Sequence, residues 1–75
     1  MGARRRQMTA REVTQVLSRH GFEFHSQRGS HEKWLQPGTK LSVIVPMHKG
    51  KTLPIGTLRA IQKGSGLPDS AWETE

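Results

Sequence analysis

Two stretches of this chain have apolar residues at helical spacing, and between them lie three short runs patterned like β-strands. The first helix is predicted from about Thr9 to His20. Thr9 and Glu12 have the spacing of a capping box, in which each side chain bonds the other residue's backbone N–H. Gly21 follows at a position where helices commonly end with a positive φ. The apolar stripe of this helix is formed by Val13, Val16 and Leu17.

Three strands are predicted between the helices, over Phe22–Ser26, Ser30–Leu35 and Leu41–Val45. A turn is expected at 27–29 and another at 36–39, where Pro and Gly fit the two middle turn positions. The third strand is almost continuously apolar and rich in β-branched residues, so we expect it to be a central strand. Successive side chains of a strand point to opposite faces of the sheet. The second strand is therefore predicted to carry His31, Lys33 and Leu35 on one face, and Glu32 and Trp34 on the other.

A second helix is predicted to begin at Pro54, with Ile55, Leu58 and Ile61 as its apolar stripe. Gly64 and Gly66 are expected to end it, and a short turn over 67–72 is expected to dock Trp72 on the body. The order is therefore α-β-β-β-α. We expect an α+β fold in which a three-stranded antiparallel meander carries both helices on one face.

The size and composition of the chain limit what it can do. Seventy-five residues form one small domain that hides only about 60% of its unfolded surface, so any chemistry should take place on an open face. The chain has no cysteine, which excludes a disulfide framework, a thiolate zinc site and a thiol nucleophile. The lack of cysteine also fits a cytoplasmic protein. No apolar run approaches the roughly 20 residues needed to cross a bilayer, so we expect no membrane partner. Residues 1–7 are expected to form a flexible basic arm before a domain over 8–75.

The chain is basic, with twelve Lys and Arg residues against six Asp and Glu and a net charge of +6. Without Arg4, Arg5 and Arg6, nine basic residues face six acidic ones, so the folded part is only mildly basic. A polyanionic partner such as RNA explains this balance, because binding it releases condensed counterions. A surface tuned for solubility explains the balance equally well.

Gly29-Ser30-His31 places an imidazole at the start of the second strand, and the basic loop from Met47 to Leu53 follows the third. Imidazole, with an unperturbed pKa near ~6.5, exchanges a proton close to neutral pH. Gly29 and Ser30 leave room for a sugar-phosphate, and the Ser30 hydroxyl can donate to a phosphate oxygen. The sequence therefore predicts a protein that handles RNA and can cut it. Candidate charge stabilisers are Arg28, Lys33, Lys49 and Lys51.

Each of these residues also has a plainer interpretation. A strand histidine taken alone is more often a surface or packing residue than a catalyst. His48 is either a second acid or base or a residue that hydrogen-bonds its loop. His20 is expected to be structural, on the buried stripe of the first helix, and His25 to be exposed. Trp34 either stacks on a base or packs in the core, and we favour the core.

A metal-dependent nuclease is disfavoured, because its carboxylates should cluster whereas the six acidic residues are scattered along the chain. The four histidines lack zinc-site spacing. We therefore expect no metal and no other cofactor.

Several of these motifs together resemble the HicA family of toxin messenger-RNA interferases, which have a fold like that of double-stranded-RNA-binding domains. They are Gly29-Ser30-His31, the following Trp34, and Val45-Pro46-x-His48-x-Gly50-x-x-Leu53-Pro54-x-Gly56-Thr57. The resemblance runs from about Met8 to Leu67. It implies the toxin of a type II toxin–antitoxin system, an endoribonuclease that cleaves messenger RNA without metal. It also implies that His31 is the catalytic histidine and that a HicB antitoxin covers the face of the protein that carries His31.

Arg28, Gly29, Ser30, Lys33, His48, Lys49 and Lys51 are the expected substrate-binding residues. The main alternative is a non-enzymatic RNA-binding module of the same fold. Double-stranded-RNA binders have a lysine cluster at the start of the last helix, whereas the sequence after Lys51 is neutral. This difference argues against binding of an RNA duplex as the main function. A module that binds only proteins would also suit the mild charge, but it leaves Gly29-Ser30-His31 unexplained.

Overall fold

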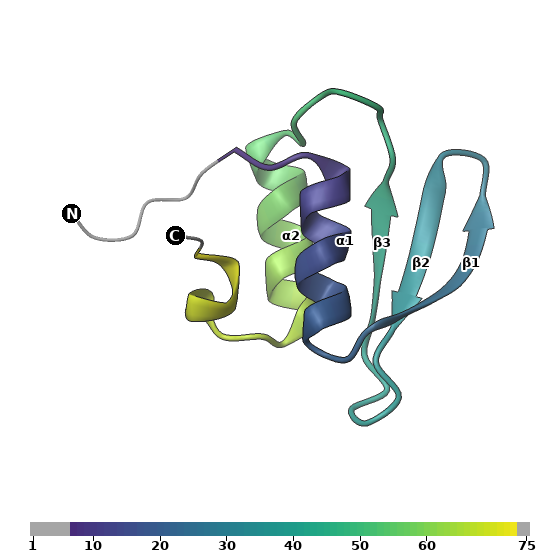
Figure 1. The fold of residues 1–75 in the computed structure, drawn as a ribbon, viewed down its shortest axis with the longest axis vertical. Helices are drawn as coiled ribbons and strands as arrows, with labels where there is room; N and C mark the ends of the chain where they lie inside the picture. Colours follow the sequence, from purple (N-terminus) through teal and green to yellow (C-terminus); the bar gives the residue numbers. More distant parts are fainter. Residues whose placement is uncertain (1–6, 74–75) are drawn as a thin grey trace.

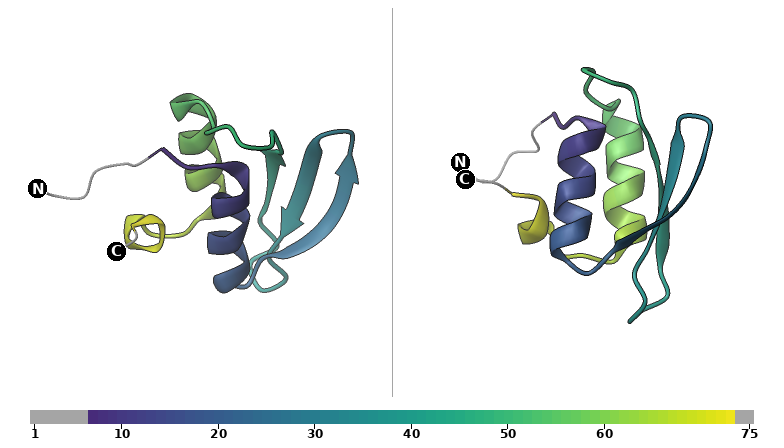
Figure 2. Two further views of the ribbon diagram at one scale, coloured as in Figure 1. Left: turned by 45° about the horizontal axis from the view of Figure 1, so that its top comes forward. Right: turned by 45° about the vertical axis from the view of Figure 1, so that its right-hand side comes forward.

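A computed structural model describes residues 7–73 and has the expected α-β-β-β-α order (Figure 1). The elements are α1 (Ala10–Arg19), β1 (Glu23–Arg28), β2 (His31–Leu35), β3 (Ser42–Pro46), α2 (Ile55–Ser65) and a 3₁₀ turn, η1 (Asp69–Trp72). The three strands form one antiparallel sheet, and both helices lie on the same side of it (Figures 1 and 2). The predicted fold class is confirmed.

The ends of α1 follow from local sequence. The Thr9 hydroxyl accepts a hydrogen bond from the Glu12 N–H at 3.2 Å, and the Thr9 N–H donates to the Glu12 carboxylate at 2.9 Å. At the other end Gly21 has φ +92°, and the Phe22 N–H reaches back to the Leu17 carbonyl at 2.9 Å. The expected burial of His20 is wrong. It caps the helix end with an exposed side chain, and its Nδ1 lies 3.0 Å from the Val16 carbonyl oxygen.

The strand order is β1-β2-β3, so the expectation that the most apolar strand is central is wrong. In a meander the second strand is necessarily the middle one, whatever its hydropathy. The apolar character of β3 has another cause: Val43 and Val45 are buried against the helices, while Ile44 points away and is 49% exposed. By contrast β1 has no buried residue, and Figure 2 shows its hairpin with β2 extending away from the helices.

The turn between β1 and β2 is shorter than predicted. β1 continues to Arg28, so Gly29 and Ser30 alone form the turn. Gly29 has φ +60° and Ser30 does not have a positive φ, which is the combination of a type II′ hairpin turn. The turn after β2 lies where it was predicted, but the positive φ is at Lys40 (+66°) and not at Gly38.

The core lies between the two helices and β3. Its members include Val13, Leu17, Val45 and Leu58, each fully or almost fully buried. Of the predicted stripe on α2, Leu58 and Ile61 are buried but Ile55 is 49% exposed. Gly64 lies inside α2, and Gly66, with φ +72°, ends it.

The two tryptophans both pack against this core. Trp34 is partly buried, and its indole N–H donates to the Glu32 carboxylate at 3.0 Å. Trp72 is buried in η1, as predicted. No helix among residues 7–73 is long and apolar enough to span a membrane. The predicted basic arm lies outside the described residues except for Gln7, which is exposed.

Candidate functional site

The hairpin turn determines where His31 lies. Because only two residues separate the strands, His31 pairs directly with Arg28 at the end of the β1–β2 ladder. Lys33, two residues along β2, pairs with Ser26 on one side and with Ile44 on the other. Residues two apart in a strand, and residues directly opposite, share a face. These side chains therefore lie together on the sheet face opposite the helices, as the alternation along β2 predicted for His31 and Lys33.

On this face the side chains line a shallow hollow of about 410 Å³ that is open to solvent. We call it the sheet hollow; its lining residues are Ser26, Arg28, His31, Lys33 and Ile44. His31 and Arg28 are exposed and Lys33 is half-buried. Within residues 7–73 these three side chains make no hydrogen bond or ion pair with one another or with a neighbour. Two cationic groups beside an imidazole thus form a positively charged surface that suits a phosphodiester.

Gly29 and Ser30 form the tip of the hairpin, next to the sheet hollow. A Cβ built on Gly29 meets no atom within 4 Å, so the backbone there is open to an approaching ligand. The Ser30 carbonyl accepts a hydrogen bond from the Met47 N–H at 2.6 Å. This bond fixes the loop after β3 against the hairpin tip, which brings two sequence motifs together in space.

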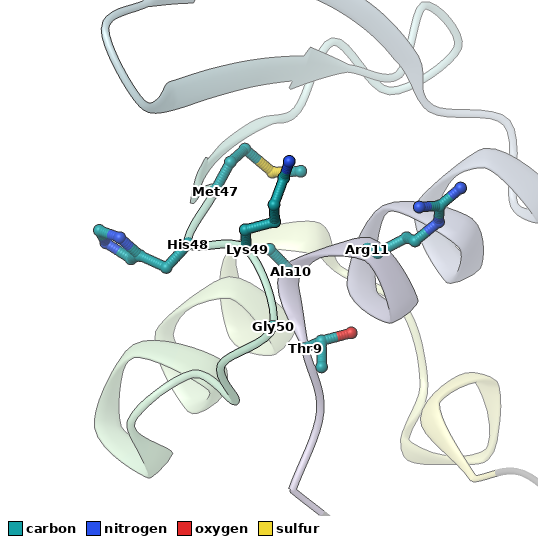
Figure 3. A pocket seen from close by; sticks show the side chains of 7 residues that line it. All are labelled: Thr9, Ala10, Arg11, Met47, His48, Lys49 and Gly50. Carbon is teal, nitrogen blue, oxygen red and sulfur yellow. The ribbon is translucent and has the colours of Figure 1, made fainter.

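The loop after β3 lines a second pocket, of about 460 Å³, together with the start of α1 (Figure 3). We call it the loop pocket; its lining residues are Thr9, Ala10, Arg11, Met47, His48, Lys49 and Gly50. Two contacts keep the start of α1 beside the segment that leads into α2. The Leu53 N–H donates to the Met8 carbonyl at 2.8 Å, and Thr9 forms an isolated antiparallel bridge with Thr52.

The predicted site residues therefore lie in three places. Arg28, His31 and Lys33 line the sheet hollow, while His48 and Lys49 belong to the loop pocket. Gly29 and Ser30 form the hairpin tip, from which the Ser30–Met47 hydrogen bond leads to the loop. Lys51 is exposed and lines neither pocket, and its backbone N–H donates to the His48 carbonyl at 3.2 Å.

Seven residues that line these pockets were not among the predicted site residues. They are Ser26 and Ile44 in the sheet hollow, and Thr9, Ala10, Arg11, Met47 and Gly50 in the loop pocket. Ile44 could have been predicted, because alternation along β3 puts it on the opposite face from Val43 and Val45. Ser26 could not, because alternation puts it on the same face as Phe24, and an irregularity in the β1–β2 register between Phe24 and Ser26 moves it to the outer face. Arg11 has no such signal, because its neighbourhood depends on how the start of α1 packs beside the loop.

The remaining histidines do not join the site. His25 is exposed, as predicted, and its Nδ1 lies 3.2 Å from the Ser26 hydroxyl oxygen. His20 lies at the far end of α1. Over the described part of the chain, no three His, Asp or Glu side chains are grouped so that they could hold a metal ion.

Comparison with curated proteins gives no match. Comparison with family models gives one over residues 10–67, described as the HicA toxin of bacterial toxin–antitoxin systems. The matched region runs from the first residue of α1 to just beyond α2, and it contains the sheet, the hairpin tip and the loop after β3. It covers well over half of the chain. With this fold and this match, the chain belongs to the HicA toxin family, and its role is that of a toxin with a cognate antitoxin.

Proposed function

We propose that this toxin is an endoribonuclease that cleaves messenger RNA without a metal ion and so blocks translation, with His31 exchanging the proton. The main observation in support is the placement of His31. Its imidazole is exposed in the sheet hollow, beside the cationic side chains of Arg28 and Lys33, and no hydrogen bond within residues 7–73 occupies it. Membership of the HicA family supports an RNA substrate.

The reaction needs only the substrate's own nucleophile. The ribose 2′-oxygen attacks the adjacent phosphorus, the bond from phosphorus to the 5′-oxygen breaks, and a 2′,3′-cyclic phosphate and a 5′-hydroxyl remain. One proton leaves the 2′-hydroxyl and one is gained by the departing 5′-oxygen. His31 serves as the base for the first transfer or as the acid for the second, a contribution worth about 10²–10⁴ in rate.

Negative charge builds up on the phosphate oxygens during this attack, and the cations of the sheet hollow are placed to stabilise it. Arg28 is the cross-strand partner of His31, and Lys33 is two residues further along the same face of β2. Arg28 can bind two phosphate oxygens at once, while Lys33 acts as a point charge. The exposed backbone at Gly29 allows the sugar-phosphate to approach closely.

Two features support a mechanism without a metal. The proton transfer and the charge stabilisation are both supplied by side chains already in the sheet hollow. The carboxylates that a two-metal nuclease needs are not grouped anywhere within residues 7–73.

The openness of the sheet hollow also fits control by an antitoxin. No element of the chain between residues 7 and 73 covers the outer face of β1 and β2 (Figure 1), so a partner that occupies this single face blocks access to His31. We propose that the partner is a HicB-type antitoxin and that the complex acts in the cytoplasm.

Incubation of the purified toxin with a transcript in EDTA tests the proposal. We expect cleavage that persists in chelator and gives cyclic-phosphate ends. The His31→Ala variant should lose at least about 10²-fold in rate. The matched control is His25→Ala, which removes another exposed histidine of the same sheet and should retain the rate. An active His31→Ala variant contradicts the role of His31. RNA binding without any product favours the non-enzymatic module.

A further inference from the structure

The loop pocket is not used by the chemistry proposed for the sheet hollow, and its composition differs. Its lining includes the aliphatic parts of Ala10 and Met47 and the bare backbone of Gly50, where a Cβ would meet no atom within 4 Å. Arg11 and Lys49, both exposed, supply positive charge at the same pocket. Figure 3 shows the Arg11 and Lys49 side chains extending outward, while the His48 ring points away from Thr9 and Arg11.

We propose that the loop pocket binds one nucleotide of the RNA strand next to the cleaved linkage, with its base against the apolar lining and its phosphate on Arg11 and Lys49. This inference rests on the proposed function for its substrate. It adds a second contact point for the RNA that does not touch the reacting atoms. Arg11 and Lys49 are thus binding residues for the phosphate, and the apolar lining that faces the base biases which nucleotide precedes or follows the cleavage site.

Three observations favour a nucleotide as the occupant. The pocket combines an apolar interior with cationic groups, which is the complement of a base joined to a phosphate. Its volume of about 460 Å³ lies in the range typical of small-ligand pockets. It also adjoins the hairpin tip, because the Met47 N–H that donates to the Ser30 carbonyl belongs to a lining residue. On this proposal, a strand that passes His31 and the tip reaches the loop pocket next.

The N-terminal end of α1 is not the only feature that supports this phosphate site. The Glu12 N–H in the first turn of α1 already donates to the Thr9 hydroxyl, and the Glu12 carboxylate accepts from the Thr9 N–H. The groups that bind the phosphate are the side chains of Arg11 and Lys49. These come from two segments that only the folded chain brings together.

Binding of a non-cleavable RNA tests the proposal independently of catalysis. The probe is a fluorescent single-stranded oligonucleotide with 2′-O-methyl riboses, and the readout is its Kd by anisotropy. The test variant is Arg11→Gln/Lys49→Gln. The matched control is Arg59→Gln/Lys63→Gln, which removes the same charge from two exposed residues of α2 that line neither pocket. Because all four side chains are exposed, we expect both variants to fold, and circular dichroism checks this.

We expect the loop-pocket variant to bind about tenfold or more weakly than the wild type, since each charge-assisted phosphate contact contributes on that order. The control should change the Kd by less than about threefold. A second probe series replaces one base at a time by an abasic nucleotide. One position should weaken wild-type binding, and that loss should be smaller in Met47→Ala, which removes part of the apolar lining.

Two other outcomes overturn the inference, and a third overturns only the proposed nuclease function. Equal losses in the two double variants mean that only net charge matters. Unchanged RNA binding with weaker antitoxin binding in the loop-pocket variant means that the pocket is a protein interface. If the toxin does not cleave RNA and the loop-pocket variant alone binds it more weakly, the proposed nuclease function fails but the nucleotide site is retained.

Discussion

Arg28 and His31 are direct partners across the β1–β2 ladder, separated in sequence only by the turn residues Gly29 and Ser30. A two-residue turn leaves the register no freedom, because a shift of one residue moves every side chain to the opposite face. The backbone conformation of Gly29 therefore keeps the Arg28 guanidinium beside the His31 imidazole. Catalysis in this toxin is proposed to depend on that turn.

The first prediction concerns Gly29. Its φ of +60° disfavours any residue with a Cβ, although no atom lies within 4 Å of that position. We expect Gly29→Ala to lower the free energy of unfolding by about 1–2 kcal/mol through backbone strain alone. In a domain of this size that is a fall in Tm of roughly 4–8 °C per kcal/mol.

Gly38→Ala is the matched control for Gly29→Ala. Gly38 also has open space around its Cβ position, but its φ is not positive. We expect no loss of stability, or a gain of up to about 1 kcal/mol from the stiffer unfolded chain. Equal losses for the two variants, measured by thermal unfolding, contradict the assignment of strain to Gly29.

The second prediction concerns the cations of the sheet hollow. Arg28→Gln and Lys33→Gln each remove one charge from the face that carries His31. If each charge contacts a phosphate, the slope of log Kd against log salt for single-stranded RNA becomes shallower by about 0.7 per substitution. Titrations at several salt concentrations measure this slope. Arg59→Gln, remote on α2, should leave it unchanged, and a slope unaltered by all three substitutions refutes the phosphate contacts.

The third prediction compares the loss of stability on truncating two apolar residues of α2 that lie one helical turn apart. Leu58 is fully buried whereas Ile55 is 49% exposed. We expect Leu58→Ala to cost about 2–5 kcal/mol, because it leaves a cavity between the helices and the sheet. Ile55→Ala should cost less than about 1 kcal/mol, since little apolar area leaves the interior. Urea unfolding measures both, and similar costs contradict the observed packing.

The fourth prediction concerns the start of α1. Thr9→Ala removes the hydroxyl that accepts from the Glu12 N–H and should cost about 1 kcal/mol of stability. Thr9→Ser keeps an equivalent hydroxyl and should stay close to the wild type. Thermal unfolding of the pair distinguishes a lost cap from a general effect of altering this position. A Thr9→Ser variant as unstable as Thr9→Ala argues against the cap.

Much of the fold was predictable because its signals are local. The capping box of Thr9 and Glu12, the glycine after α1 and the turn at Pro37 and Gly38 each act within a few residues. Alternation along β2 likewise predicted which face carries His31 and Lys33. The resemblance to the HicA family, which the family match confirms, rested on motifs of the same local kind.

The errors share a physical cause. Hydropathy indicates how much of a strand is buried but not which strand lies in the middle, so β3 was expected to be central although it lies at the edge. Helical spacing placed Ile55 on the stripe with Leu58, but Ile55 is the first residue of α2 and its side chain is 49% exposed. His20 was assigned to the buried stripe, yet the helix ends there and its side chain faces solvent.

The sequence by itself determined the elements, their order and the face of β2 on which the imidazole lies, because these depend on short-range backbone preferences and side-chain periodicity. Only the tertiary structure decided that Ile44 joins Arg28, His31 and Lys33 in one hollow, and that Arg11 meets Lys49 at a second pocket. Those groupings depend on strand register and on packing between segments distant in the chain. Such contacts form only when the whole core closes, so no single stretch of residues encodes them.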